Sequence, residues 1–339
     1  MMTPRGLLKT FVKRLRQVAK RATVVIAAIT LPQICVAEGT FVSVGSGSAG
    51  GVYYKVSKSL CALVNRELSG REVWCSPEAT PGSVYNLQRL RTGELDFALV
   101  QSDVQFYAFT GSNAWLGNAF PGLRSVLSLH QELVTVLAPA DSAIDSLGGL
   151  KGRRFNIGSA GSGTRATWDA LEGSLGWSAD AGVRKLAVKP DAAPSMLCGG
   201  DLDAILLLVG HPSPFVQRHL SSCGMKFVAM DGPQIDSFVS THPYYERGAI
   251  QASAYGTDRD VPTFGVRATL VTAAHVEDKL VYALAKAVLS NLAEFKMLAP
   301  ALRSLQARQA MEVGLTAPLH PGAERAFREL GISRGAAVR

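Results

Sequence analysis

The chain has 339 residues, 47% of them hydrophobic and 18% charged, which is enough apolar sequence for about two domains. Its net charge of +8 would suit a nucleic acid or an anionic membrane, but seven basic residues and no acidic residue fall within residues 1–37. The rest of the chain contains 28 Lys and Arg and 27 Asp and Glu, so it is nearly neutral. That balance argues against nucleic-acid binding.

Residues 1–37 have the pattern of a secretory signal peptide. A basic start is followed by the apolar run Ala22–Leu31 and by small residues that end at Ala37. The run is too short to span a bilayer and Pro32 interrupts it. The residue before Cys35 is not small, so we do not expect a lipid on this cysteine. We predict cleavage after Ala37 and a periplasmic mature protein.

The first part of the mature chain alternates strands and helices. Hydrophobic patterns predict strands at 40–44, 71–76 and 95–100, with helices at 52–68 and 84–90. The run at 95–100 is almost entirely apolar, as in a parallel strand that is covered on both faces. The polar residues Gln101 and Ser102 follow its carboxyl end, where open α/β sheets bind ligands.

A buried strand at 133–137 and a linker at 139–152 lead into a second set of elements. Strands are predicted at 153–157, 183–188, 204–209, 226–230 and 263–272. Helices are predicted after residue 163, at 193–198, from 210–212 onward, at 277–298, around 302–311 and at 323–330. The Gly- and Pro-rich stretch 231–262 is expected to carry the chain back to the first part.

Two pairs of segments repeat at similar spacing. Residues 44–51 and 157–163 each read as a strand, a Gly/Ser loop and a helix start, and residues 93–100 resemble residues 200–207. The repeats predict two lobes of similar construction, each with a helix N-terminus directed toward a shared cleft. The first turn of a helix offers unpaired N–H groups and the positive end of a dipole, which suit a carboxylate.

Candidate ligand-binding residues lie in these loops, at strand ends and on the return segment. They are Ser48, Gly50, Tyr53, Tyr54, Gln101, Ser102, Ser159, Ser162, Gly163, Thr164, Gly210 and Tyr255. Simple helix capping is an alternative role for the loop serines, as is core packing for one of the two adjacent tyrosines. Arg165 fits either a pair with a ligand carboxylate or an orientation toward solvent.

Other chemistries fit the sequence less well. The mature chain has four cysteines, for which disulfides Cys61–Cys75 and Cys198–Cys223 or four separate thiols are both open. None of the six histidines stands at metal-ligand spacing, and there is no Gly-x-Ser-x-Gly motif of a serine hydrolase. The glycines at 45–50 fit a dinucleotide fingerprint, but the export signal and the second Gly/Ser loop disfavour a nicotinamide enzyme. We therefore expect no cofactor and no enzymatic activity.

Several motifs, taken together and in order, resemble the TAXI family, the extracytoplasmic solute-binding proteins of one branch of the TRAP transporters. They lie at 45–54, 96–103, 161–164, 242–245, 261–266 and 319–323, so the resemblance covers about residues 40–332. The sequence departs from the family pattern at Cys75, at 211–214 and at 253–255.

The resemblance implies an α/β fold of two lobes, like the type II periplasmic binding proteins, each lobe a mostly parallel sheet flanked by helices. Lobe one is expected at 38–137, lobe two at 138–245, and the return to lobe one at 246–339. The implied function is capture of a small organic anion or amino acid, such as glutamate or a dicarboxylate, by a monomer that delivers it to a TRAP permease. A periplasmic sensory binding protein with the same two lobes is the alternative.

Overall fold

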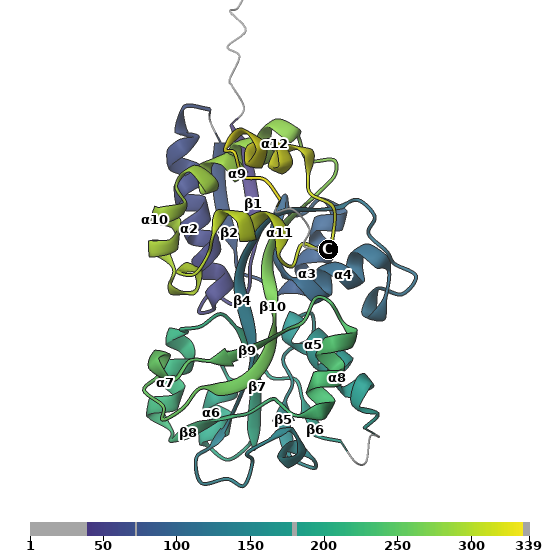
Figure 1. Ribbon diagram of the computed structural model, residues 1–339, viewed down its shortest axis with the longest axis vertical. Coiled ribbons are helices and arrows are strands. Elements are labelled where there is room, and N and C mark those ends of the chain that lie inside the picture. The colour runs from purple at the N-terminus through teal and green to yellow at the C-terminus, as the bar shows by residue number, and fades with distance from the viewer. Residues whose placement is uncertain (1–38, 72, 178–181, 335–339) are drawn as a thin grey trace, which may run out of the picture. The chain divides into compact units, whose positions relative to one another are not determined.

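The computed structural model describes residues 39–71, 73–177 and 182–334 (Figure 1). The predicted signal peptide lies outside these ranges. The described residues form ten strands, which are β1 (Thr40–Gly45), β2 (Val73–Glu78), β3 (Phe97–Gln101), β4 (Leu123–Pro139), β5 (Arg154–Asn156), β6 (Arg184–Leu186), β7 (Ala204–Val209), β8 (Met225–Val228), β9 (Glu246–Ile250) and β10 (Val261–Ala273).

The helices begin with α2 (Val52–Glu67), α3 (Ser83–Thr92), α4 (Ser102–Thr110), α5 (Gly163–Leu175), α6 (Ala193–Cys198) and α7 (Pro214–Ser222). They continue with α8 (Pro233–Thr241), α9 (Asp278–Ser290), α10 (Leu292–Leu298), α11 (Ala307–Glu312) and α12 (Pro321–Glu329). Within the described ranges, none of them combines the length and the apolar character that crossing a bilayer requires.

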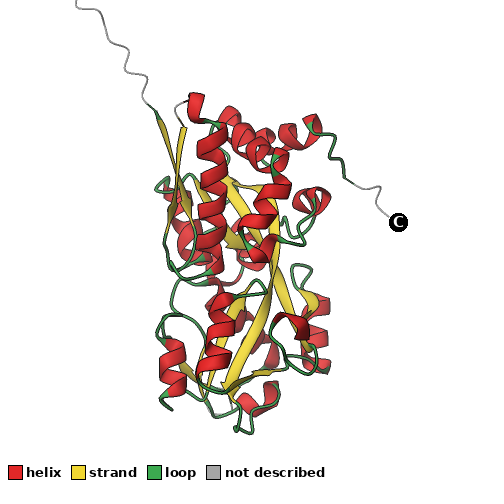
Figure 2. Ribbon diagram, turned by 90° about the vertical axis from the view of Figure 1, so that its left-hand side faces the viewer, coloured by secondary structure: helices red, strands yellow, loops and turns green. Residues whose placement is uncertain are grey.

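All ten strands belong to one mixed sheet with helices on both faces (Figure 2). The main strand order is β2-β1-β3-β10-β4-β7-β5-β6, with β8 beside β4 and β9 beside β10. The pairs at each end, β1 with β2 and β3, and β5 with β6 and β7, are parallel. The pairs made by β4 and β10 are antiparallel, so the sheet is more mixed than the sequence pattern suggested.

The long strands β4 and β10 connect the two ends of the sheet. They pair with each other along most of their length and run between the helices of both ends (Figure 1). Only the second half of β4 was predicted. Its first half carries Arg124, Ser125, Ser128 and His130, which interrupt the hydrophobic pattern, although all but Arg124 are buried.

Three other elements differ from the sequence prediction. Helix α4 begins directly after Gln101, where only a strand end was expected. The segment 231–262 holds α8 and β9. The predicted helix at 277–298 is divided into α9 and α10 at Asn291, whose φ of −111° and ψ of 28° are not helical.

The apolar core is continuous through the middle of the sheet. One buried cluster contains Leu87 and Val104 beside the first Gly/Ser loop region as well as Phe155 and Trp168 near the second. A second cluster lies beneath α2, α9 and α12. The chain from residue 39 onward accordingly forms one compact unit. The cysteines form the disulfides Cys61–Cys75 and Cys198–Cys223.

Candidate functional site

A pocket of about 120 Å³ lies where the N-terminal ends of five helices converge. The helices are α2, α3, α4, α5 and α7, and strands β4 and β7 complete the wall. The lining residues are Gly47, Ser48, Gly51, Val52, Tyr53, Pro81, Gly82, Ser83, Gln101, Glu132, Ser162, Gly163, Thr164, Pro190, Leu207, Leu208, Val209, Ser213 and Phe215. A cavity of this size holds roughly ten water molecules, or a solute of about as many non-hydrogen atoms.

Local sequence explains why these helices begin at the pocket. Ser162 caps α5 by accepting a 3.1 Å hydrogen bond from the backbone N–H of Arg165. Ser213 caps α7 in the same way through Val216, at 3.4 Å, and a proline follows at the first helical position. The first N–H groups of a helix have no acceptor in the preceding turn, and those that the serine caps and neighbouring loops do not take are available to a ligand. Five such ends give the pocket a positive potential without a basic side chain.

Gly163 is required by the close approach of α5 to α3 and α4. A Cβ atom at this position would lie 2.1 Å from Oε1 of Gln101 and 2.8 Å from Oγ of Ser83. Beside it, the backbone N–H of Tyr85 donates a 3.1 Å hydrogen bond to the carbonyl of Gly161. The second Gly/Ser loop therefore packs directly on the start of α3, and small residues make that contact possible.

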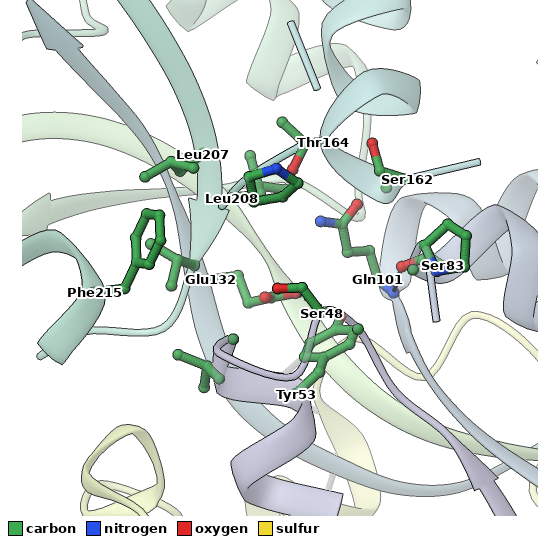
Figure 3. A pocket seen from close by; sticks show the side chains of 18 of the residues that line it. Ser48, Tyr53, Ser83, Gln101, Glu132, Ser162, Thr164, Leu207, Leu208 and Phe215 are labelled. Carbon is green, nitrogen blue, oxygen red and sulfur yellow. Dashed lines mark hydrogen bonds between the residues drawn. The ribbon is translucent and has the colours of Figure 1, made fainter. Parts of the chain in front are cut away.

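Glu132 of β4 places a carboxylate in the pocket wall. The residue is 3% exposed, and its Oε2 accepts a 2.6 Å hydrogen bond from the Tyr53 hydroxyl. Burial raises the pKa of Glu132 to about 8, against a smaller opposing effect of the Tyr53 hydrogen bond. Burial also raises the pKa of Tyr53, so the tyrosine stays protonated and donates. Figure 3 shows both side chains facing the interior of the pocket.

Apolar side chains form the other side of the pocket. They are Val52, Pro190, Leu207, Leu208, Val209 and Phe215, contributed by α2, β7, α7 and the chain before α6. In Figure 3, Leu207 and Phe215 lie across the cavity from Ser83 and Gln101. The pocket thus has one wall of helix ends and small polar groups and one wall of hydrocarbon.

Half of the residues predicted from sequence line this pocket. They are Ser48, Tyr53, Gln101, Ser162, Gly163 and Thr164, drawn from both Gly/Ser loops and from the end of β3. The other six, Gly50, Tyr54, Ser102, Ser159, Gly210 and Tyr255, are not among its lining residues. Arg165 is directed elsewhere and pairs with Asp169 one turn along α5, at 2.8 Å.

Several of the residues outside the pocket have structural partners. The buried Ser102 hydroxyl accepts the N–H of Arg267 at 3.0 Å. A Cβ atom on Gly210 would lie 2.5 Å from the His130 ring, so this glycine serves packing. The Tyr255 hydroxyl accepts the N–H of Ser213 at 2.7 Å and therefore supports the start of α7 from outside the pocket.

The sequence reasoning missed Glu132, Ser83 and the apolar wall. Glu132 did leave a signal, because it is the one acidic residue between Leu127 and Leu137 and directly precedes the predicted strand at 133–137. Ser83 follows a Pro-Gly turn and starts a helix, which is the same pattern as the two loops that were recognised. In the described part of the chain, no group of three or more His, Cys, Asp or Glu side chains is placed to hold a metal ion.

Several solved structures share the fold of this chain. A protein from Bordetella bronchiseptica RB50 is 13% identical, with a TM-score of 0.53, over 86% of this chain and 98% of that one. A protein described as a periplasmic transporter is 12% identical, with a TM-score of 0.51, over 87% and 93%. A protein from Xanthomonas citri bound to chloride ion is 14% identical, with a TM-score of 0.50, over 86% and 95%.

The sequence profile of the NMT1-like family matches residues 44–331. This range contains the flanking helices, every residue of the pocket and all of the sheet except the first four residues of β1. The chain therefore belongs to the NMT1-like family.

Proposed function

We propose that this protein is an extracytoplasmic solute-binding protein, which captures a small carboxylate-bearing solute, an organic anion or an amino acid, and delivers it to a TRAP-type permease. The observation that carries the proposal is the convergence of five helix N-termini on one pocket. Their free N–H groups satisfy the charge of a carboxylate in a site that contains no lysine or arginine.

In this proposal the protein works by closing two lobes on its ligand. Residues 38–137 and 246–339 form one lobe and residues 138–245 form the other. Strands β4 and β10, which pair with each other and lie between β3 of the first lobe and β7 of the second, act as the hinge. The ordered TAXI-like motifs support the assignment to a permease driven by an ion gradient. The signal-like pattern of residues 1–37 supports periplasmic localisation. We also propose that the protein acts as a monomer.

A thermal-shift screen of organic acids and amino acids tests the binding function, because a ligand of the folded state raises the unfolding temperature. The variant Thr164→Trp should abolish the shift, since this half-buried residue faces the pocket and the indole would fill it. Ser174→Trp, on the exposed face of the same helix, is the matched control and should keep the shift. Equal ligand shifts in both variants would exclude this pocket as the site.

An uptake assay in cells separates transport from sensing. Loss of the protein should abolish uptake of the ligand, and an ionophore that dissipates the ion gradient should do the same. Unchanged uptake in cells without the protein would favour the alternative, a periplasmic sensory binding protein.

A further inference from the structure

Glu132 is the only acidic residue among those that line the pocket, and no lysine, arginine or histidine lines it. Asp103 and Tyr53 are the titratable groups that act on it, both without positive charge. The nearest strand neighbours add no free cation, because Arg267 of β10 is paired with Glu246 of β9 at 2.8 Å. The carboxylate therefore has no cationic partner in the pocket wall.

The hydrogen bonding of Glu132 is also incomplete. Tyr53 is the only partner of its side chain among the described residues. A carboxylate has about four lone-pair sites for hydrogen bonds, so several remain open toward the cavity. A buried carboxyl group keeps its negative charge only when a cation or several donors face it, and otherwise it takes up a proton. In this pocket a ligand is the available source of such a cation.

The positions of the polar groups divide the cavity into three parts. The starts of α3 and α5, with Ser83 and Thr164, suit a carboxylate. Glu132 and Tyr53 suit a positively charged donor. The hydrocarbon wall at Leu207 and Phe215 suits an apolar group, because it offers no polar partner to a second charge.

We propose that the ligand is a zwitterionic amino acid with an apolar side chain. Its carboxylate lies at the helix N-termini, its ammonium group pairs with Glu132, and its side chain contacts the wall formed by Leu207 and Phe215. This proposal rests on the proposed function and narrows its ligand class. It excludes glutamate and dicarboxylates as preferred ligands, because their second carboxylate would face either Glu132 or the apolar wall.

The proposal predicts the direction of proton exchange on binding. The raised pKa of Glu132, about 8, means that the empty pocket holds a protonated side chain at neutral pH. An ammonium group pairs with the ionised form, so binding releases a proton and affinity rises between about pH 6 and pH 8. An anionic ligand that accepts a hydrogen bond from protonated Glu132 would show the opposite dependence.

Titration calorimetry with L-leucine and 4-methylpentanoate tests the role of the ammonium group, because the two share a carbon skeleton and only leucine has an amino group. L-Phenylalanine, L-glutamate and succinate complete the panel. Wild-type protein should bind leucine or phenylalanine at least about 100-fold more tightly than 4-methylpentanoate. Titrations in buffers of different ionisation enthalpy should show proton release.

The variant Glu132→Gln tests the residue itself, since glutamine keeps an acceptor for Tyr53 but not the charge. It should weaken binding of the amino acid by about 100-fold and leave the weak binding of 4-methylpentanoate unchanged or improved. The control is Glu67→Gln at the last residue of α2, the opposite end of the helix from the pocket. The proton measurement on wild-type protein needs no variant, so a misfolded Glu132→Gln would not leave the proposal untested.

The outcomes distinguish this proposal from the proposed function. The proposed ligand class is overturned if 4-methylpentanoate, succinate or glutamate binds more tightly than the apolar amino acids, or if binding takes up a proton. The proposed function as a solute-binding protein would still stand in either case. If no compound in the panel binds wild-type protein, the proposed ligand class is overturned, and the proposed function is overturned as well if the thermal-shift screen also finds no ligand.

Discussion

Thr167 of α5 donates a 2.6 Å hydrogen bond to Asp103 of α4, although the two residues are 64 positions apart in the sequence. Asp103 is fully buried and also accepts a 3.0 Å hydrogen bond from Tyr245. Together with the backbone hydrogen bond from Tyr85 of α3 to Gly161, this contact holds the second Gly/Ser loop and α5 against α3 and α4. The pocket lies beside these contacts, so the relative positions of the starts of α3, α4 and α5 depend on them.

The first prediction concerns Asp103. Burial raises its pKa in the folded protein from the ordinary 3.8 to about 6, so its stabilising contribution is complete below about pH 4 and is lost as the pH rises to about 6. In Asp103→Asn this part of the pH dependence should be absent. Urea unfolding at about pH 4, 5, 6 and 7 should show the free energy of unfolding of wild type falling relative to the variant. Parallel curves would contradict the assignment.

The second prediction separates the roles of two neighbouring hydroxyls. Ser162→Ala removes the cap of α5 and should lower the free energy of unfolding by about 1 kcal/mol. Thr164→Ala should leave stability nearly unchanged, because no hydrogen bond links its side chain to the described residues. It should instead weaken ligand binding by about 0.5–1.5 kcal/mol. Denaturant titration and calorimetry on both variants check this division, and it fails if Thr164→Ala loses stability without losing affinity.

The third prediction concerns Gly163. The added methyl group of Gly163→Ala would collide with the side chains of Gln101 and Ser83, so it should both destabilise the protein and weaken binding. Gly173→Ala in the same helix meets open space and should stabilise the protein by about 0.4–1 kcal/mol. Thermal unfolding of the two variants provides the comparison. Full stability of Gly163→Ala would show that the side chains of Gln101 and Ser83, or α5 itself, move aside at no cost.

The fourth prediction concerns the disulfide between α2 and β2. Replacing both Cys61 and Cys75 with alanine should lower the free energy of unfolding by about 2–4 kcal/mol, because the unfolded chain gains freedom. The position of α2 should persist, since Asn65 makes two hydrogen bonds to the backbone of Cys75, at 2.6 and 3.0 Å. Unfolding in urea measures the loss, and ligand binding by the folded variant checks the pocket. An unchanged urea midpoint would contradict a stabilising bridge.

The sequence by itself was sufficient for the class of fold and for part of the pocket. Local signals were strong at the Gly/Ser loops, where a strand, small residues and a capping serine follow one another. Of the ligand-binding residues that these loops predicted, Ser48, Ser162, Gly163 and Thr164 line one cavity. The almost entirely apolar run before Gln101 likewise located a strand end at the pocket. Such features depend on residues adjacent in the chain, so a sequence displays them directly.

Only the tertiary structure decided which side chains face the cavity. Glu132 and Tyr53 are 79 positions apart in the sequence. They form a hydrogen bond because the folded chain places β4 beside the start of α2. Gly210 and Tyr255 have equally suitable chemistry, yet β7 and its neighbours direct them to packing and to support of α7. The long antiparallel pair β4–β10 brings these segments together through contacts that no local pattern records. The position of the Glu132 carboxyl group and of the apolar wall in the pocket therefore depends on how the sheet is assembled. The helix starts that surround the pocket are determined by local sequence.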